Sequence, residues 1–278
     1  MPHLVPSILT SGTAKKLLEG DPTVSLDLGL TETTLERTST CWILPGGITI
    51  DLEALHKIAE QETVAYLVIK EGVFQVALAG KHFYKLLPTA GAPTIEIDGI
   101  RMHRTSGTTP DHDARSKLDV LGLDGGKVLD TCTGLGYTAI ESVRRGAEQV
   151  ITVELDPLVI RIAMVNPWSA QLFSGERIHM IIGDTYELSA IFPECFFEYV
   201  IHDPPRHVRA GVLYGLGYYR RLYRLMVSGG RLFHYTGEPG KKYRGLDVKK
   251  GVGFRLIEAG FKGVSYYRDV RGFTALKP

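Results

Sequence analysis

Amide side chains, cysteines and long apolar runs are all scarce in this sequence of 278 residues. It contains a single asparagine, Asn166, and four glutamines. Such depletion of thermolabile amides is typical of proteins from thermophiles, and we expect a source of that kind. The three cysteines, Cys41, Cys132 and Cys195, lie far apart and form no metal-ligand pattern. Because three thiols cannot all pair, we expect reduced cysteines and no bound metal.

The sequence also shows neither a basic-then-apolar signal segment nor an apolar run of membrane-spanning length. We therefore expect a cytoplasmic protein with no membrane partner. The whole chain has a net charge of +1, but residues 1–104 hold nine Lys and Arg against twelve Asp and Glu. The rest holds 23 basic and 19 acidic residues, an excess that permits a nucleic-acid partner without requiring one.

The first hundred residues contain short β-prone runs and one helical segment. Residues 64–70 and 73–79 flank the turn Glu71-Gly72 and predict a β-hairpin. Residues 51–61 predict a helix with an acidic N-cap, since apolar residues fall on one face. The other β-prone runs are residues 23–30, 40–44 and 94–97.

A stretch rich in turn residues, 105–113, follows and predicts a domain boundary. Asp111 or Asp113 could cap a short helix through Leu121 that leads into the second domain. We expect a smaller mixed α+β domain over residues 1–108, which binds substrate or mediates formation of a homodimer. A catalytic domain is expected over residues 109–278.

Strands and helices alternate regularly from residue 127 onward. Near-continuous apolar strands separated by helices predict an α/β fold whose parallel sheet is covered on both faces. A last helix over residues 247–259 precedes two closing strands, 263–270 and 272–276. The expected strands before it are residues 127–133, 149–155, 178–183, 197–203 and 231–236, and the expected helices are 137–145, 157–172, 186–192 and 212–227.

The first of these strands runs into the sequence Asp130-Thr-Cys-Thr-Gly134-Leu-Gly136-Tyr. Two glycines let the backbone turn tightly and let a ligand approach the start of the next helix. Ala139 stands where a dinucleotide-binding loop has its third glycine. Asp130 would repel a pyrophosphate but suits a ligand that carries an ammonium group. By itself the turn also fits other α/β folds.

Acids at the ends of the next two strands distinguish a nucleoside-binding loop from the glycine turn of another α/β fold. Glu154 follows Gly134 by 20 residues, and a carboxylate there can accept both hydroxyls of a ribose. Asp156, just before Pro157, fits the start of a helix better. Asp184 ends the third strand, where it can receive an adenine amino group. Three acids at three successive strand ends favour a nucleoside site.

The series DTCTGLGY, VELDP, GDTYEL and HDPPR, over residues 127–206, resembles the motifs of class I S-adenosylmethionine-dependent methyltransferases. In detail the chain is similar to an archaeal branch of predicted methyltransferases. The resemblance implies a seven-stranded, mostly parallel Rossmann-like sheet with S-adenosylmethionine across the strand ends. It assigns the loop residues to the methionine part, Glu154 to the ribose and Asp184 to the adenine. The expected cofactor-binding residues are Asp130, Thr131, Gly134, Gly136, Tyr137, Thr138, Glu154, Leu155, Asp156, Asp184 and Thr185.

The fourth strand ends in Asp203-Pro204-Pro205-Arg206, which we expect to be the catalytic segment. Prolines fix the backbone and lack N–H groups, so the segment offers only hydrogen-bond acceptors. Such a cluster suits an amino group, whose nitrogen lone pair it would orient toward the methyl carbon. The segment resembles the Asp/Asn-Pro-Pro-aromatic motif of methyltransferases that act on exocyclic or amide amines. Arg206 departs from it, because the motif has Tyr or Phe there to stack on the acceptor.

Basic and aromatic residues surround this segment. We expect Arg206, His207, Lys241 and Lys242 to contact a substrate backbone. The arginines of residues 220–224 could meet phosphates or form the solvated face of an amphipathic helix. His202, inside the fourth strand, fits a core histidine better than a base.

These residues favour a methyltransferase that alkylates an exocyclic amine of a base, such as cytosine, in ribosomal or transfer RNA. The alternative is a small-molecule alkyltransferase, for instance a polyamine aminopropyltransferase on the same sheet. Such an enzyme needs extra acids for the polyamine, which Arg206 and His207 would repel. A third alternative is a scaffold that binds the cofactor or RNA without transferring a group.

Overall fold

The computed structural model describes residues 7–205, 211–237 and 248–278, and the chain divides into two compact units. The first unit comprises residues 1–111 together with 158–171. The second comprises residues 112–157 and 172–278. The chain therefore passes from one unit to the other three times.

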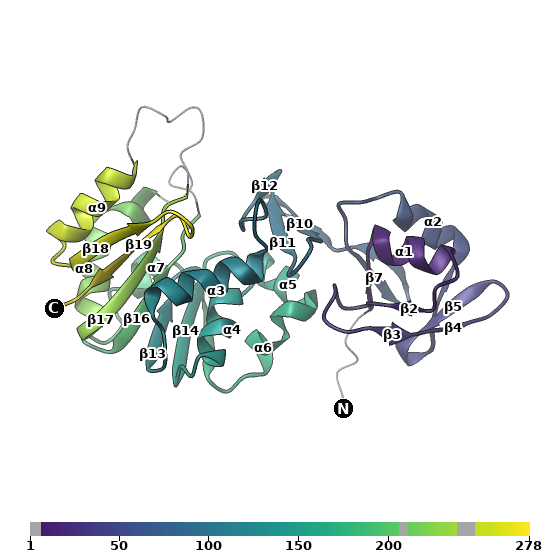
Figure 1. Ribbon diagram of the computed structural model, residues 1–278, viewed down its shortest axis with the longest axis horizontal. Helices are drawn as coiled ribbons and strands as arrows, with labels where there is room; N and C mark the ends of the chain where they lie inside the picture. The colour runs from purple at the N-terminus through teal and green to yellow at the C-terminus, as the bar shows by residue number, and fades with distance from the viewer. Residues whose placement is uncertain (1–6, 206–210, 238–247) are drawn as a thin grey trace. The chain divides into compact units, whose positions relative to one another are not determined.

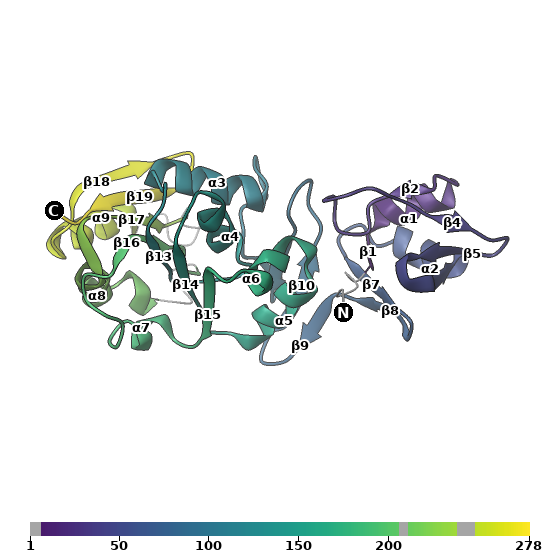
Figure 2. The same cartoon turned by 90° about the horizontal axis from the view of Figure 1, so that it is seen from below.

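A seven-stranded sheet forms the centre of the second unit (Figures 1 and 2). The strands lie in the order β15-β14-β13-β16-β17-β19-β18, and the first five run parallel while β19 is antiparallel to both of its neighbours. The expected seven-stranded, mostly parallel sheet is confirmed. Its strands are β13 (Lys127–Asp130), β14 (Gln149–Glu154), β15 (Ile178–Ile182), β16 (Phe197–His202), β17 (Met226–Tyr235), β18 (Lys262–Tyr267) and β19 (Gly272–Leu276).

Because β13, β14, β15 and β16 are parallel, their carboxyl ends share one edge of the sheet. Each predicted motif lies directly after one of these strands, so the fold brings the motifs to a common edge. The helices of this unit are α3 (Pro110–Leu121), α4 (Tyr137–Arg144), α7 (Thr185–Leu188), α8 (Leu216–Leu225) and α9 (Val248–Glu258), with the 3₁₀ helix η3 (Gly211–Tyr214) before α8.

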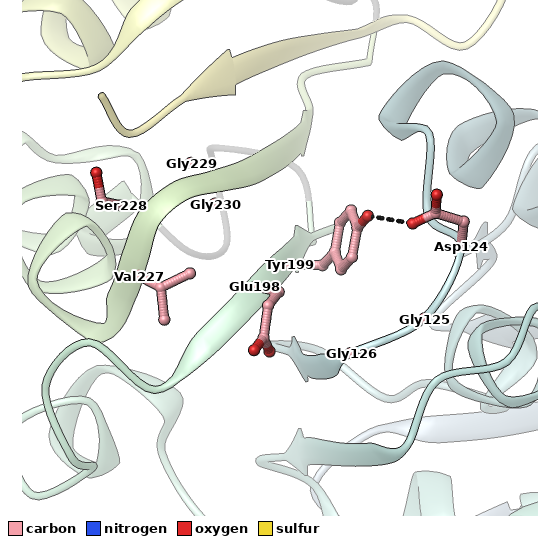
Figure 3. Close-up of a pocket in the computed structure, with 9 residues that line it drawn as sticks. All are labelled: Asp124, Gly125, Gly126, Glu198, Tyr199, Val227, Ser228, Gly229 and Gly230. Atoms are coloured by element: carbon pink, nitrogen blue, oxygen red, sulfur yellow. Dashed lines mark hydrogen bonds between the residues drawn. The ribbon is translucent and has the colours of Figure 1, made fainter.

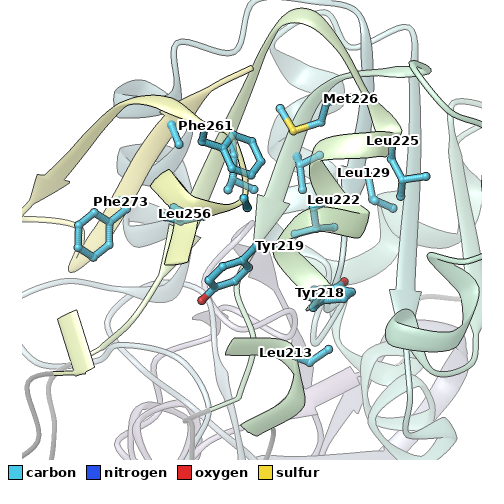
Figure 4. Packing of buried hydrophobic residues seen from close by; sticks show 14 of the residues in the cluster. Leu129, Leu213, Tyr218, Tyr219, Leu222, Leu225, Met226, Leu256, Phe261 and Phe273 are labelled. Carbon is cyan, nitrogen blue, oxygen red and sulfur yellow. The ribbon is translucent and has the colours of Figure 1, made fainter. Parts of the chain in front are cut away.

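Apolar side chains from α8 and α9 pack against one face of the sheet (Figure 4). Leu222, Leu225 and Leu256 from these helices meet Leu129 and Phe273 from the strands. Complete burial of a leucine side chain is worth about 2 kcal/mol, so this cluster is a main source of stability for the unit. Alternation along β16 and β17 then directs the next residues, Asp203 and Tyr235, to the opposite face.

The prediction of one helix over residues 157–172 is wrong in one respect, because the helix is interrupted before Pro167. α5 (Pro157–Val165) ends before Asn166, the 3₁₀ helix η2 (Pro167–Ser169) follows, and α6 (Ala170–Ser174) completes the segment. Proline lacks an N–H and disfavours a helical conformation in the residue before it. Asn166 accordingly has an extended backbone, and its side chain accepts a hydrogen bond from the Trp168 N–H at 3.2 Å.

Two helices and several small antiparallel sheets make up most of the first unit. α1 and α2 enclose a core with Leu17, Trp42 and Leu55, all at most 2% exposed. The predicted helix near residue 51 is confirmed, since the Asp51 carboxylate accepts a hydrogen bond from the Ala54 N–H at 2.7 Å. The elements are β1 (Ser7–Leu9), α1 (Ser11–Leu18), β2 (Thr23–Val24), β3 (Thr33–Thr34), β4 (Glu36–Arg37), β5 (Cys41–Leu44), η1 (Pro45–Gly47), β6 (Ile48–Asp51), α2 (Leu52–Ala59), β7 (Tyr66–Ile69), β8 (Gly72–Gln75), β9 (Ala77–Ala79), β10 (Phe83–Leu87), β11 (Thr94–Ile97) and β12 (Ile100–Arg101).

The predicted hairpin is present as β7 and β8, which pair antiparallel with Ile69 opposite Gly72. The turn is therefore Lys70-Glu71, one residue earlier than predicted, and the second strand ends at Gln75 instead of residue 79. The long strand expected over residues 23–30 is wrong beyond Val24. There the Asp27 carboxylate accepts hydrogen bonds from the Leu30 and Thr31 N–H groups, and these close a turn instead. Within the described parts of the chain, no helix has the length and apolar character needed to cross a bilayer.

Candidate functional site at the carboxyl edge of the sheet

The loop after β13 turns on two glycines with left-handed backbones. Gly134 has φ 54° and Gly136 has φ 81°. A Cβ on Gly136 would also lie 2.9 Å from Leu172 Cδ2, so no other residue fits there without strain. The Gly134 N–H donates a 2.9 Å hydrogen bond to the Glu154 carboxylate, which ties this loop to the end of β14. The sequence assigned both residues to one nucleoside site but did not predict this contact.

Asp130 lies beneath the loop and is completely buried. Its Oδ2 accepts hydrogen bonds from the hydroxyls of Thr138 at 3.1 Å and Thr152 at 2.9 Å. Its Oδ1 has no hydrogen-bond partner. Burial raises the pKa of Asp130 to about 7, despite the two hydroxyl donors. This carboxyl group therefore supports the loop from inside and carries an unmet hydrogen-bonding capacity.

Glu154 lies next to apolar side chains that are exposed to solvent. Its carboxylate also accepts a hydrogen bond from the Asp156 N–H at 3.0 Å. Leu155 is 66% exposed, and Ile182, at the end of β15, is 54% exposed. The Asp184 side chain accepts the Tyr186 N–H at 2.8 Å and so caps α7. This edge therefore combines a carboxylate with uncovered apolar surface.

A chain of buried hydroxyl and imidazole groups connects the ends of three strands. The His202 Nε2 lies 2.9 Å from the Leu213 carbonyl and must donate to it. Burial lowers the pKa of His202 to about 4, so its Nδ1 accepts from the Thr131 hydroxyl at 2.7 Å. Tyr218 bonds to Thr131 and, at 2.8 Å, to the Thr185 hydroxyl. His202 is thus a core histidine, as expected, and Thr131 and Thr185 face inward.

Tyr137 and Thr138, from the first turn of α4, are also buried. The predicted cofactor residues consequently form two groups. Gly134, Glu154, Leu155, Asp156 and Asp184 lie along the open edge, whereas the others support that edge from within.

The Asp-Pro-Pro segment follows β16 directly. Pro204 is buried and Pro205 is exposed. The Pro205 carbonyl accepts a 3.1 Å hydrogen bond from the hydroxyl of Tyr214, a buried residue of η3. This contact fixes the backbone of the segment from below. Arg206, His207, Lys241 and Lys242, the expected substrate contacts, lie outside the described residues.

Asp203 has an ion pair that the motif analysis missed. Lys117 of α3 is buried, and its Nζ lies 2.5 Å from Asp203 Oδ2 and 2.7 Å from Asp113 Oδ2. Asp113 therefore lies inside α3, which begins at Pro110, and neither it nor Asp111 is the expected cap. The sequence did carry a signal for the pair of Asp113 and Lys117. Asp113 and Lys117 are four residues apart and share a helix face with the buried Leu118 and Leu121.

The arginines of α8 make structural contacts with α7. Arg221 donates to the Tyr186 carbonyl at 2.6 Å, and its guanidinium lies 3.9 Å from the centre of the Tyr186 ring. Arg224 donates to the Ser189 carbonyl at 2.7 Å. These side chains satisfy carbonyls at and just beyond the end of α7, whereas Arg220 is exposed. Arg221 and Arg224 therefore do more than form the solvated face of the helix, because both donate hydrogen bonds to carbonyls of neighbouring residues.

A shallow pocket of about 430 Å³ lies at the opposite, amino-terminal edge of the same sheet (Figure 3). Asp124 and Tyr199 line it and share a 2.7 Å hydrogen bond. Its other lining residues come from the chain before β13 and from the starts of β16 and β17. None of the predicted motif residues contributes to this pocket.

The residues at the carboxyl edge fit S-adenosylmethionine. Exposed Leu155 and Ile182 offer apolar surface to a purine, and Glu154 between them can accept ribose hydroxyls. The left-handed glycines leave the loop without side chains where a ligand must approach. The negative charge of Glu154 suits the positively charged sulfonium and ammonium groups.

Comparison with known proteins places these observations in a family. A model described as "Conserved hypothetical protein 95" matches residues 112–213. The chain is 44% identical to the uncharacterized protein MJ1233 of Methanocaldococcus jannaschii, over 99% of this chain and 97% of that protein. It is 34% identical to the polyamine aminopropyltransferase of Mycobacterium tuberculosis, but only over 42% of this chain and 24% of that enzyme.

Among solved structures, the chain resembles a spermidine synthase in complex with the transition state analogue AdoDATO. The TM-score is 0.60 at 20% identity, over 73% of each chain. The structural similarity shows a shared fold and no more, and the fold of this chain is accordingly the Rossmann-like methyltransferase sheet.

Proposed function

The chain belongs to the same family as the uncharacterized protein MJ1233 of Methanocaldococcus jannaschii, and from the residues at the carboxyl edge of its sheet we propose that it is an S-adenosylmethionine-dependent N-methyltransferase. The proposed acceptor is an exocyclic amine of an RNA base, in ribosomal or transfer RNA, with cytosine as one candidate. The observation that carries the proposal is the acceptor-only Asp203-Pro204-Pro205 segment, which lies on the same sheet edge as the nucleoside-type residues.

In this proposal, residues at the ends of β13, β14 and β15 would hold the cofactor. Glu154 would hold the ribose, and Leu155 and Ile182 would contact the adenine. Glu154 is already oriented by the Gly134 and Asp156 N–H groups, so little order has to be gained when the nucleoside binds.

Asp203 receives a hydrogen bond from the acceptor amine and fixes the direction of the nitrogen lone pair. The hydrogen bond from Tyr214 to the Pro205 carbonyl holds the adjoining backbone in place. When bound, S-adenosylmethionine would supply a methyl group to the nitrogen lone pair of the amine, and the electron pair of the broken C–S bond would stay on sulfur. The surplus proton on nitrogen then passes to water. Asp203 therefore contributes mainly by positioning.

One observation favours a second candidate, an aminopropyltransferase that acts on a polyamine. The partial similarity to a polyamine aminopropyltransferase covers part of this chain, and Asp113 adds a buried acid close to Asp203. Extra carboxylates are what a polycationic substrate needs. Lys117, which pairs with both acids, counts against this candidate.

Two measurements test the proposed function. Calorimetric titration with S-adenosylmethionine and with its decarboxylated form identifies the sulfonium donor. Mass spectrometry of nucleosides from a deletion strain then identifies the acceptor. Loss of one methylated nucleoside supports the methyltransferase, whereas an unchanged RNA profile with altered polyamines supports the second candidate.

An Asp203→Ala variant should lose methyl transfer by at least about a hundredfold while retaining affinity for S-adenosylmethionine, because it removes the group that positions the amine. Asp124→Ala is the matched control, since Asp124 lies at the other edge of the same sheet. The control should retain activity. Full activity of Asp203→Ala would show that the acceptor segment is wrongly assigned.

A further inference from the structure

The acceptor carboxylate is not an isolated charge, because a buried ammonium lies between it and a second carboxylate. Lys117 Nζ is 2.5 Å from Asp203 Oδ2 and 2.7 Å from Asp113 Oδ2, and the Lys117 side chain is only 7% exposed. Burial alone favours a neutral lysine. The carboxylates of Asp203 and Asp113 outweigh that effect and raise the pKa of Lys117 above its usual value. Lys117 thus stays charged.

The ion pair changes what Asp203 can attract. With Lys117 charged, the three groups have a summed charge of −1 instead of −2. A carboxylate that is already paired with an ammonium attracts a second cation weakly, but it still accepts a hydrogen bond from an uncharged N–H.

An aromatic ring lies beside this cluster. Tyr235 ends β17, and the register that pairs His202 with His234 makes Asp203 and Tyr235 the next neighbours on adjacent strands. Lys117 Nζ lies 4.6 Å from the centre of the Tyr235 ring, so one ammonium contacts both the ring and the Asp203 carboxylate. Tyr235 is partly exposed. It therefore places a ring next to the start of the acceptor segment. The resembling motif supplies its aromatic residue from the segment itself, at the position that Arg206 holds in this sequence.

We infer that Lys117 and Tyr235 complete the acceptor site and make it selective for an uncharged amino group on a planar ring, against a polyammonium substrate. This inference rests on the proposed function and names its substrate class. Lys117 is a positioning residue that acts through Asp203. Tyr235 determines specificity by stacking on the acceptor ring.

The charge side of the inference is tested without catalysis. Calorimetry measures spermidine binding to the full-length wild-type protein and to Lys117→Met and Lys117→Arg variants, at matched ionic strength. Lys117→Met leaves Asp113 and Asp203 without their shared counter-charge, so it should bind spermidine at least about tenfold more tightly than the wild type. Lys117→Arg keeps the charge and should resemble the wild type. Tight spermidine binding by the wild type, or equal binding by all three proteins, would overturn the inference.

The ring side is tested by methyl transfer from labelled S-adenosylmethionine to in vitro transcribed ribosomal and transfer RNA. Tyr235→Phe keeps the ring and should retain the wild-type KM within about twofold, whereas Tyr235→Leu should raise KM about tenfold with a smaller effect on kcat. Equal KM values for the two variants would overturn this role. Thermal melting of each variant identifies misfolding.

Lys117→Met supplies a further readout that a purely structural residue would not change. Asp203 faces Lys117 and Asp113 from α3, Tyr235 from β17, and Asp130 and Tyr214 through longer-range charge interactions. Without Lys117, the acidic limb of the pH–rate profile should move upward by at least about one pH unit. Failure of any RNA to accept a methyl group would contradict the proposed function, and the spermidine titrations would still decide the charge inference.

Discussion

At the scale of single residues, Asp130 is a carboxyl group whose burial is costly when it is ionised. Its pKa is raised from 3.8 to about 7, so the folded protein holds a proton that the unfolded chain releases above pH 4. Stability therefore falls as pH rises from about 4 to 7 and is lowest, with respect to this group, above pH 7. The unpartnered Oδ1 is consistent with a protonated oxygen in the unliganded protein.

Asp130→Asn should remove this pH dependence, because the amide copies the neutral carboxyl group. The variant should gain on the order of 2 kcal/mol over the wild type between pH 5 and pH 7. Urea unfolding of both proteins at pH 5, 7 and 8 measures the difference. A difference that stays constant from pH 5 to pH 8 would show that Asp130 is ionised in the folded state throughout this range.

Gly136 is a second single-residue test. Gly136→Ala should destabilise the protein by about 2 kcal/mol, because the alanine would keep a positive φ and contact Leu172. Gly217→Ala is the matched control: it lies in α8 with no atom within 4 Å of the added Cβ, and should stabilise by up to about 1 kcal/mol. Chemical denaturation compares them. A neutral Gly136→Ala would mean that the loop relaxes freely.

The sequence was sufficient to indicate the candidate site because each motif lies at or just after the end of a buried parallel strand. The local sequence pattern shows where each strand ends. From it, Gly134, Glu154 and Asp203 could be predicted to lie at the carboxyl edge of the sheet. Lys117 could not be assigned in this way. Its partner Asp203 lies 86 residues away, and only the pairing of α3 with the strand ends makes them neighbours. Which predicted residues face inward, as Thr131 and Thr185 do, also depends on tertiary packing.

At the scale of elements, α7 is a single short turn that depends on α8 for its carbonyl partners. Arg224→Ala should cost about 1 kcal/mol, because the Ser189 carbonyl loses a charged donor. Arg220→Ala in the same helix removes only an exposed contact to Glu258 at 3.7 Å and should stay within about 0.5 kcal/mol. Thermal melting separates them. Equal losses would mean that helix propensity, and not the α7 contact, decides the effect.

Elements of the sheet were predicted more accurately than those of the first unit. Strands such as β14 carry apolar residues on both faces, as Val150, Ile151 and Val153 show, and a helix on each side confines them. The strands of the first unit are two to five residues long and are set by their partners. Val76, for example, separates β8 from β9, which pair with different strands. No local pattern specifies that change of partner.

At the scale of the whole molecule, residues 158–171 belong to the first unit although they follow β14 of the second. Within the first unit, the Trp168 indole donates a 3.0 Å hydrogen bond to the Leu28 carbonyl, and Leu158 packs closely against Gly80. A fragment of residues 112–278 would expose these side chains. It should melt at least about 10 °C below the full chain or aggregate.

Addition of residues 1–111 as a separate polypeptide should restore solubility, because it returns the missing partners of Trp168 and Leu158. Size-exclusion chromatography measures both outcomes. A fragment that is monomeric and as stable as the full chain would show that residues 158–171 need no such partners.

The three crossings of the chain between its units also determine which fragments a single cut can produce. A protease that cuts once at any of these crossings never yields one fragment for each unit, because at least one fragment retains residues from both. The same holds for gene recombination, since no single breakpoint transfers the methyltransferase-like sheet intact without part of its companion unit. A recombination event with one breakpoint therefore transfers residues of both units together.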